Sequence, residues 1–277
     1  MFVSVDGKLG SDELARVSPL DHGLLVGDGV FETLRVYDGT PFAWRRHIER
    51  LERSAEGLGL HVPDRRLLRE RADEVLSAND LADARLRITV TGGPSPLGSE
   101  RGDTPPTVIV AASPVTPWPP TTMLVTVPWP RNERGAVTGL KTISYAENVR
   151  ALAYAAERGG GEALFTNTVG DVCEGTGANI FAVLDGTLTT PPEESGCLPG
   201  VTRALTLEIA AAAGIPTSVV RIRPEELLGA SEVFVTSSTR EIQPVDRIDD
   251  TPFGAPGPLT ERLAEAFSEL VRTTPDP

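Results

Sequence analysis

Three short segments of the chain each contain a residue that is reactive or that can bind a charged ligand. The first contains Lys141, the second contains Glu174, and the third is Gly200-Val201-Thr202. A partly desolvated lysine loses some of its preference for the ammonium form, so its amine can attack an aldehyde. A carboxylate can keep a ring nitrogen protonated, and the N–H groups at a helix start attract phosphate. Together these groups could hold and activate a phosphorylated aldehyde cofactor.

Each segment taken alone has an ordinary structural explanation. Lys141 could be a solvated surface lysine, Glu174 an edge-strand charge, and Thr202 a simple helix cap. Two observations favour chemistry for the lysine. Lys8 and Lys141 are the only lysines of the chain, and Lys141 follows an apolar and glycine-containing stretch. The ordered set is therefore more informative than any of its members.

Two further groups offer donors for an anion. Ser237, Ser238 and Thr239 follow a predicted strand, and strand ends are common ligand sites in α/β folds. Arg50 could supply a fixed positive charge with a forked geometry that suits phosphate. The ordinary alternatives are a polar turn for the hydroxyls and a helix-surface ion pair for Arg50. His47, one turn before Arg50, is a weaker candidate.

Composition excludes several classes of partner. The net charge of −13, without a run of basic residues, makes nucleic acid and anionic membranes poor partners. No stretch approaches the roughly 18 apolar residues of a membrane span. Cys173 and Cys197 are too few for a disulfide framework and lack metal-ligand spacing, so we expect no metal site. The first eight residues lack the regions of a secretory signal, so we expect a cytoplasmic protein.

The hydrophobic pattern predicts the elements that must position these residues. In the first part of the chain we expect strands at 2–8, 30–37, 85–91 and 107–112, and helices at 48–58 and 64–80. In the second part we expect helices at 146–158, 202–213 and 259–271, and strands at 163–167, 179–184, 187–189, 218–222 and 232–235.

A proline-rich run, residues 113–120, cannot sustain a helix or a central strand, because proline fixes φ and lacks an N–H donor. We therefore expect an interdomain linker at residues 114–121. It would separate an N-terminal α/β domain of residues 1–113 from a C-terminal cofactor-binding domain of residues 122–277. The predicted fold class is α/β, of the α+β type, with a smaller N-terminal domain and a larger C-terminal one.

Taken together, these residues resemble the fold-type IV (class IV) pyridoxal-phosphate enzymes. That family includes branched-chain aminotransferase, D-amino acid transaminase, R-selective amine transaminase and aminodeoxychorismate lyase. The matching residues are Gly27–Thr33, His47–Leu51, Lys141, Glu174, Asn179–Phe181, Gly200–Arg203 and Ser237–Thr239. The resemblance implies pyridoxal 5′-phosphate as cofactor, a pseudo-barrel C-terminal domain and a homodimer.

The resemblance also implies a role for each matching position. Lys141 would form a Schiff base with the cofactor and carry a proton, and Glu174 would bind the pyridine nitrogen. Tyr145 would hydrogen-bond the phenolic oxygen of the cofactor. The phosphate would be held by Arg50, Val201, Thr202, Ser237 and Ser238.

The expected substrate site departs from the patterns of the family. Phe31 stands where D-amino acid transaminases carry a tyrosine, and the loop 93–101 lacks their Arg-x-His carboxylate trap. Arg101 could replace that trap if the loop folds inward, and otherwise it is a solvated loop arginine. Thr239 offers a further donor. Branched-chain enzymes typically carry Phe-Glu-Gly, whereas this chain has Phe31-Glu32-Thr33, a form that also occurs in aminodeoxychorismate lyases.

The leading functional hypothesis is a transaminase that moves the amino group of a D-amino acid such as D-alanine to a 2-oxo acid by a ping-pong mechanism. The runner-up is aminodeoxychorismate lyase, which releases 4-aminobenzoate and pyruvate. Transamination of branched-chain L-amino acids or of R-amines is a further alternative. A non-catalytic relative would be expected to lose the lysine or the carboxylate first, and both are present.

Overall fold

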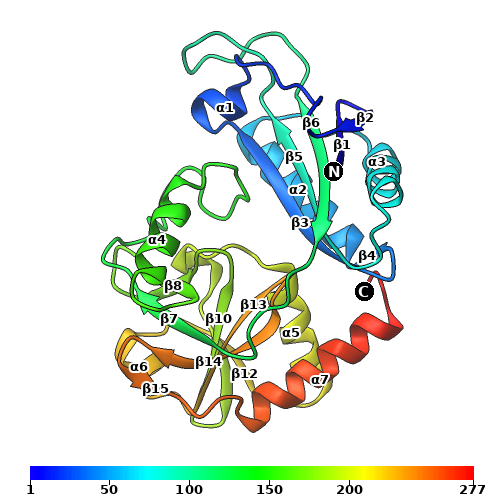
Figure 1. Ribbon diagram of the computed structural model, residues 1–277. Coiled ribbons are helices and arrows are strands. Elements are labelled where there is room, and N and C mark those ends of the chain that lie inside the picture. The colour runs from blue at the N-terminus through cyan, green and yellow to red at the C-terminus, as the bar shows by residue number, and fades with distance from the viewer. The chain divides into compact units, whose positions relative to one another are not determined.

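The computed structural model describes all 277 residues, which form two compact units (Figure 1). Unit 1 comprises Met1–Thr116, Leu140–Tyr145 and Pro275–Pro277, and unit 2 comprises Pro117–Gly139 and Ala146–Thr274. Lys141 thus falls in unit 1, whereas the sequence analysis placed it in the C-terminal domain. The linker at residues 114–121 stays a prediction.

Unit 1 is built on a six-stranded antiparallel sheet with the strand order β2-β1-β6-β5-β3-β4. Its strands are β1 (Phe2–Val5), β2 (Lys8–Ser11), β3 (Gly29–Tyr37), β4 (Thr40–Pro41), β5 (Ala84–Thr91) and β6 (Val108–Pro114). Its helices are α1 (His22–Val26), α2 (Trp44–Leu58) and α3 (Arg65–Ala78).

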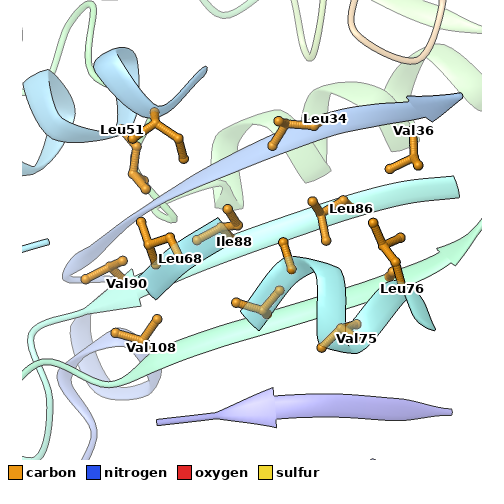
Figure 2. Close-up of a cluster of buried hydrophobic side chains, with 14 of the residues drawn as sticks. Leu34, Val36, Leu51, Leu68, Val75, Leu76, Leu86, Ile88, Val90 and Val108 are labelled. Carbon is orange, nitrogen blue, oxygen red and sulfur yellow. The ribbon is translucent and has the colours of Figure 1, made fainter. Parts of the chain in front are cut away.

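The core of unit 1 lies between one face of this sheet and the helices α2 and α3. Alternate residues of β3 and β5 point to that face, as Leu34 and Ile88 do in Figure 2. Leu51 of α2 and Leu68 of α3 pack against them, and all four side chains are fully buried. The other face of β3 and β5 carries Phe31 and its neighbours in the register. The pleat therefore places Phe31 on the face of β3 that points away from this core.

The start of α2 is held by a segment from the far end of the sequence. Ala43 precedes the helix in a left-handed conformation (φ 52°) and cannot cap it with its own side chain. Instead the Asp276 carboxylate accepts a 2.9 Å hydrogen bond from the N–H of Arg45, and the carbonyl of Pro275 accepts one from Ala43. A carboxylate there satisfies a donor that the helix leaves unpaired and favourably meets its dipole.

Unit 2 is built on a nine-stranded mixed sheet with the order β12-β11-β10-β13-β14-β7-β8-β9, and β15 pairs with β14. The strands are β7 (Thr122–Thr126), β8 (Glu162–Thr166), β9 (Val172–Gly175), β10 (Asn179–Leu184), β11 (Thr187–Thr190), β12 (Thr217–Val219), β13 (Glu232–Ser237), β14 (Glu241–Ile248) and β15 (Thr251–Pro252). The helices are α4 (Ala146–Ala156), a 3₁₀ turn at Glu193–Ser195, α5 (Val201–Ala212), α6 (Pro224–Leu228) and α7 (Pro258–Thr273).

Alternation along β10 builds the core of unit 2 on both faces of its sheet. Ile180 packs in an apolar cluster with Leu227 of α6, while Phe181 stacks on Phe234 of β13 with ring centroids 5.0 Å apart. Strand β10 pairs with β13 so that Asn179 lies opposite Thr236. This register places the start of β10 beside the end of β13, at one end of the sheet.

Most of the predicted elements are present, with shifted ends. The strands β2, β4, β7, β14 and β15 and the short helices α1 and α6 were not predicted. The expectation that Ser113 and Pro114 cannot lie in a central strand was wrong, because both close β6. Pro114 is tolerated since β1 pairs with β6 only at Ile109–Ala111, so one side of the strand is open at the proline. No helix combines the length and apolar character needed to cross a membrane.

The contact at the start of α2 is testable by substitution. Asp276→Ala should lower the free energy of unfolding by about 1 kcal/mol, because it removes the acceptor for the N–H of Arg45. Asp276→Asn keeps an acceptor oxygen and should retain most of the stability. Urea denaturation of the two variants and the wild type measures this, and equal stability of all three would contradict the assignment.

Candidate active site

The segment that carries Lys141 extends the sheet of unit 1 along the open edge of β3. The N–H of Phe31 donates to the carbonyl of Lys141 (3.0 Å), and the N–H of Ile143 donates to the carbonyl of Gly29 (2.9 Å). The Ser54 hydroxyl of α2 accepts from the N–H of Lys141 at 3.1 Å. These bonds fix the backbone of the lysine on both sides, which explains why the segment belongs to unit 1.

The ring of Phe31 is the common neighbour of three candidate side chains. The Lys141 amine nitrogen lies 4.4 Å from the ring centroid, and the Arg87 guanidinium carbon lies 3.7 Å from it. The ring of Tyr145 meets Phe31 edge-on at 5.1 Å. The structure thus brings Phe31, Lys141 and Tyr145 together. It adds Arg87, which the sequence analysis did not select.

The sequence pattern around Arg87 indicates a functional position only when the strand register is known. Period-two alternation in β5 places Arg85, Arg87 and Thr89 on one face, which looks like an ordinary solvated face. Only the pairing of Phe31 with Thr89 shows that this face also carries the candidate site. Arg87 donates to the Thr89 hydroxyl at 3.1 Å and forms no salt bridge.

Arg50 lies in a buried ionic group on the opposite face of β3. Its guanidinium donates to both oxygens of Glu32 (2.7 and 2.8 Å), and the His47 Nδ1 lies 2.7 Å from the same carboxylate. Burial would raise the pKa of Glu32, but the two basic partners outweigh it and hold the pKa far below its usual range. Burial lowers the pKa of His47 despite the attraction of Glu32. Glu32 therefore stays ionised and anchors the Arg50 side chain.

Arg101 is an exposed loop residue whose guanidinium is nevertheless bonded to the rest of unit 1. Its guanidinium donates to both oxygens of Asp28 (2.7 and 2.6 Å) and to the carbonyl of Gly59 (2.9 Å). The hydrogen bond from Arg101 holds the pKa of Asp28 below its usual value, with burial opposing. The loop thus folds back onto the start of β3, and the charge of Arg101 is already neutralised.

In unit 2, Glu174 lies near the end of β9 with its carboxylate held by a turn. It accepts hydrogen bonds from the N–H of Leu198 (2.9 Å) and from the amide of Asn179 (3.4 Å). Arg131 approaches its other oxygen at 4.0 Å. Asn179 also donates to the carbonyl of Leu198, so that one side chain joins both segments. The carboxylate is therefore oriented by neighbours that the sequence analysis gave no role.

The start of α5 lies beside this group. Gly200 precedes the helix in an extended conformation and has no side chain to cap it. The N–H groups of the first turn, which include those of Val201 and Thr202, therefore have no capping side chain at this position. A side chain at position 200 would come within 2.0 Å of the Asn179 amide oxygen, so only glycine allows the close approach.

The turn after β13 completes the donors of unit 2. Asn179 lies opposite Thr236, which immediately precedes Ser237 and Ser238. The Thr236 hydroxyl is buried without a hydrogen-bond partner, and the Ser237 hydroxyl accepts from the N–H of Arg240 at 3.2 Å. Thr239 lies in the same turn. A carboxylate, an uncapped helix start and a hydroxyl-rich turn in one unit fit a ring nitrogen and a phosphate.

Comparison with known proteins identifies the family of the chain. The chain matches the family model for class IV amino-transferases over residues 29–248. It is 35% identical to a Methanocaldococcus jannaschii protein provisionally named a branched-chain-amino-acid aminotransferase, over 98% of this chain and 96% of that protein. The aminodeoxychorismate lyase of Bacillus subtilis is 33% identical over 98% and 95% of the two chains. The D-alanine aminotransferase of Staphylococcus epidermidis is 30% identical over 98% of each.

Solved structures agree over the same length. The branched-chain aminotransferase of Thermoproteus uzoniensis with norvaline superposes with a TM-score of 0.92 at 34% identity, covering 98% of this chain and 94% of that one. A T.th. branched-chain amino acid aminotransferase with pyridoxamine 5′-phosphate gives 0.91 at 31% identity, covering 98% and 93%. The chain therefore belongs to the class IV aminotransferases, the fold-type IV enzymes that use pyridoxal 5′-phosphate.

Proposed function

We propose that this enzyme transfers the amino group of an α-amino acid, with D-alanine as the first candidate, to a 2-oxo acid by a ping-pong mechanism. One observation carries the proposal: the Arg87 guanidinium and the Lys141 amine lie against the same Phe31 ring, at 3.7 and 4.4 Å from its centroid. A substrate amine beside Lys141 would then have a cation near its carboxylate. A simple amine would make no use of that cation.

The residues of unit 2 would bind the cofactor. When bound, pyridoxal 5′-phosphate supplies an aldehyde that condenses with amines and a ring that takes up electrons. Glu174, kept in place by Leu198 and Asn179, would accept a hydrogen bond from the protonated ring nitrogen. Backbone N–H groups of Val201 and Thr202 would bind the phosphate. The hydroxyls of Ser237 and Ser238 would add donors to it.

In unit 1, the Lys141 amine would bind the aldehyde and then carry the proton that leaves the substrate α-carbon. Tyr145 would donate to the phenolic oxygen of the cofactor. Arg50, oriented by Glu32, would add a fixed positive charge for the phosphate. Each of these roles depends on a side chain whose neighbours already restrict its position.

Arg87 fits the substrate carboxylate better than Arg101 does. The guanidinium of Arg101 is already paired with the Asp28 carboxylate and bonded to Gly59, whereas that of Arg87 has a hydroxyl and an aromatic ring as neighbours. Thr33 lies directly opposite Arg87 in the sheet register. A threonine and an arginine side by side occupy space next to Phe31, which favours a small substrate side chain. Thr239 stays a further candidate for the carboxylate.

Elimination is the second candidate function. It is favoured by Phe31-Glu32-Thr33 and by the 33% identity to an aminodeoxychorismate lyase. The same lysine would then release pyruvate and 4-aminobenzoate from aminodeoxychorismate. The 35% identity to the M. jannaschii protein keeps branched-chain L-amino acids in the test as well.

A homodimer is also part of this proposal. Unit 1 exposes apolar side chains on α1 and on the loop bonded to it, with exposed fractions of 70% for Leu24 and 77% for Leu97. The N–H of His22 donates to the carbonyl of Gly93, which holds the helix and the loop together. Apolar residues gathered in this way are typical of protein interfaces. A cytoplasmic location stays a prediction.

A panel of half-reactions tests the proposed activity. D-Alanine should convert the bound cofactor to its pyridoxamine form, with smaller or no conversion by L-leucine and (R)-1-phenylethylamine, as followed by absorbance. Aminodeoxychorismate without a 2-oxo acid should release no pyruvate. Lys141→Ala should abolish every half-reaction. If no amino acid reacts with the wild type, transamination is excluded.

Arg87→Ala should raise the KM for D-alanine by about ten- to hundred-fold, because it removes a charge-assisted hydrogen bond. D-Alaninamide lacks the carboxylate, so its reaction should be insensitive to the substitution. Arg85→Ala, on the same face of β5, is the matched control. An unchanged KM for D-alanine in Arg87→Ala would remove Arg87 from the substrate site.

Leu24→Asp should shift the enzyme from dimer to monomer in sedimentation velocity, because it introduces a charge into the apolar face of α1. Leu67→Asp, on the exposed side of α3, is the control and should leave the association unchanged. A monomeric wild type, or a dimer that tolerates Leu24→Asp, would contradict the proposed interface.

A further inference from the structure

Two turns of unit 2 converge on a buried carboxylate that has no role in the proposal so far. Glu162 begins β8 and is 3% exposed. Its Oε1 accepts from the N–H of Thr176 (2.9 Å), from the Thr176 hydroxyl and from the N–H of Ala163 (3.0 Å). A Cβ at position 175 would lie 3.1 Å from its carboxyl carbon, so glycine there allows a close approach. Glu162 therefore fixes the turn that follows Glu174.

The second oxygen of Glu162 reaches the turn after β13 through Arg240. The Arg240 guanidinium lies 3.3 Å from Oε2 and also donates to the carbonyl of Gly161 (2.9 Å) and to Gln243 (2.5 Å). It packs at 3.7 Å over the ring of Trp118. Arg240 is 9% exposed, so this is a buried ion pair whose charges are surrounded by donors and acceptors.

Both turns adjoin residues that the proposed function assigns to the cofactor. The Thr176 turn connects Glu174 to Asn179, and the N–H of Arg240 donates to the Ser237 hydroxyl. The backbone of Thr176 is further held by the amide of Asn148, which donates to its carbonyl at 2.5 Å. In Figure 1, β8, which begins with Glu162, lies in the same sheet as β10, which follows the Thr176 turn, and β13, which precedes the Arg240 turn.

We propose that Glu162 and Arg240 are a positioning pair that does not touch the cofactor. The pair fixes the turn 176–178, which follows Glu174, relative to the turn 238–240, which follows Ser237. The proposal rests on the roles assigned to Glu174, Ser237 and Ser238 under the proposed function. A cofactor that binds through its ring and its phosphate at once requires both turns at a set separation. The pair supplies that constraint because Glu162 is bonded to the Thr176 turn and to Arg240, which belongs to the other turn.

The chain contains a matched control for a purely structural role. Glu232 is a second buried carboxylate of unit 2, and it accepts from the N–H groups of Leu259 (3.0 Å) and Thr260 (2.8 Å) and from the Thr260 hydroxyl (2.7 Å). Its donors are the same in kind as those of Glu162, but they belong to the start of α7. Loss of either carboxylate should reduce stability, whereas only the loss of Glu162 should loosen the two turns.

The test is a titration of the apoenzyme with pyridoxamine 5′-phosphate, which lacks the aldehyde and so binds without Lys141. Glu162→Gln should weaken binding by about ten-fold or more, in the range of ordinary coupling between sites. Arg240→Lys keeps the charge and should lose less. Glu232→Gln should bind as the wild type does. The thermal midpoint of each variant, measured in parallel, separates loss of stability from loss of affinity.

The double variant Glu162→Gln/Arg240→Lys should bind no more weakly than Glu162→Gln alone, because the two residues act through one contact. If Glu162→Gln does not fold, Arg240→Lys and Thr176→Val decide the question, and wild-type affinity in both would overturn the pair. Equal weakening by Glu162→Gln and Glu232→Gln would also overturn it. A wild type that does not bind the ligand would instead refute the proposed function.

Discussion

A carboxylate can be buried only where donors replace the water that it loses, and this requirement shapes the candidate site of unit 2. Glu162 and Glu174 both lie on strands of the sheet, and each is held by backbone N–H groups of a turn that belongs to another segment. Each carboxylate lies on a strand, so its hydrogen bond also holds the turn that supplies the N–H group. Glu162 thereby holds Thr176 in place, and Glu174 holds Asn179 and Leu198.

In unit 1 a buried carboxylate is stabilised by basic side chains rather than by backbone N–H groups. Glu32 is fully buried and is paired with Arg50 and His47, so that one face of β3 holds a nearly neutral group. The opposite face carries Arg87, whose guanidinium contacts an aromatic ring and a hydroxyl rather than a carboxylate. An anion that reaches this face would therefore meet positive charge, although the whole chain carries −13.

The sequence predicted the elements whose periodicity is strong, such as the helices α2, α3, α5 and α7, and the family segments that contain Lys141 and Glu174. It did not predict Arg87, because alternation alone cannot show which strand faces a site. It also placed Lys141 with the C-terminal half of the chain, since hydrogen bonds to β3 across more than a hundred residues leave no local pattern. Short strands such as β7 were missed because they are defined by pairing rather than by composition.

The comparison of Arg101 with Arg87 shows why family motifs leave the substrate open. Both are arginines of unit 1, and a motif search would favour the loop residue because related enzymes hold carboxylates there. The guanidinium of Arg101 is already bonded to Asp28 and Gly59, so binding a substrate would require breaking an existing ion pair. Arg87 would gain a partner without losing one. The residue that recognises a substrate is therefore decided by which charge the fold has left uncompensated, and that depends on tertiary contacts that no short motif contains.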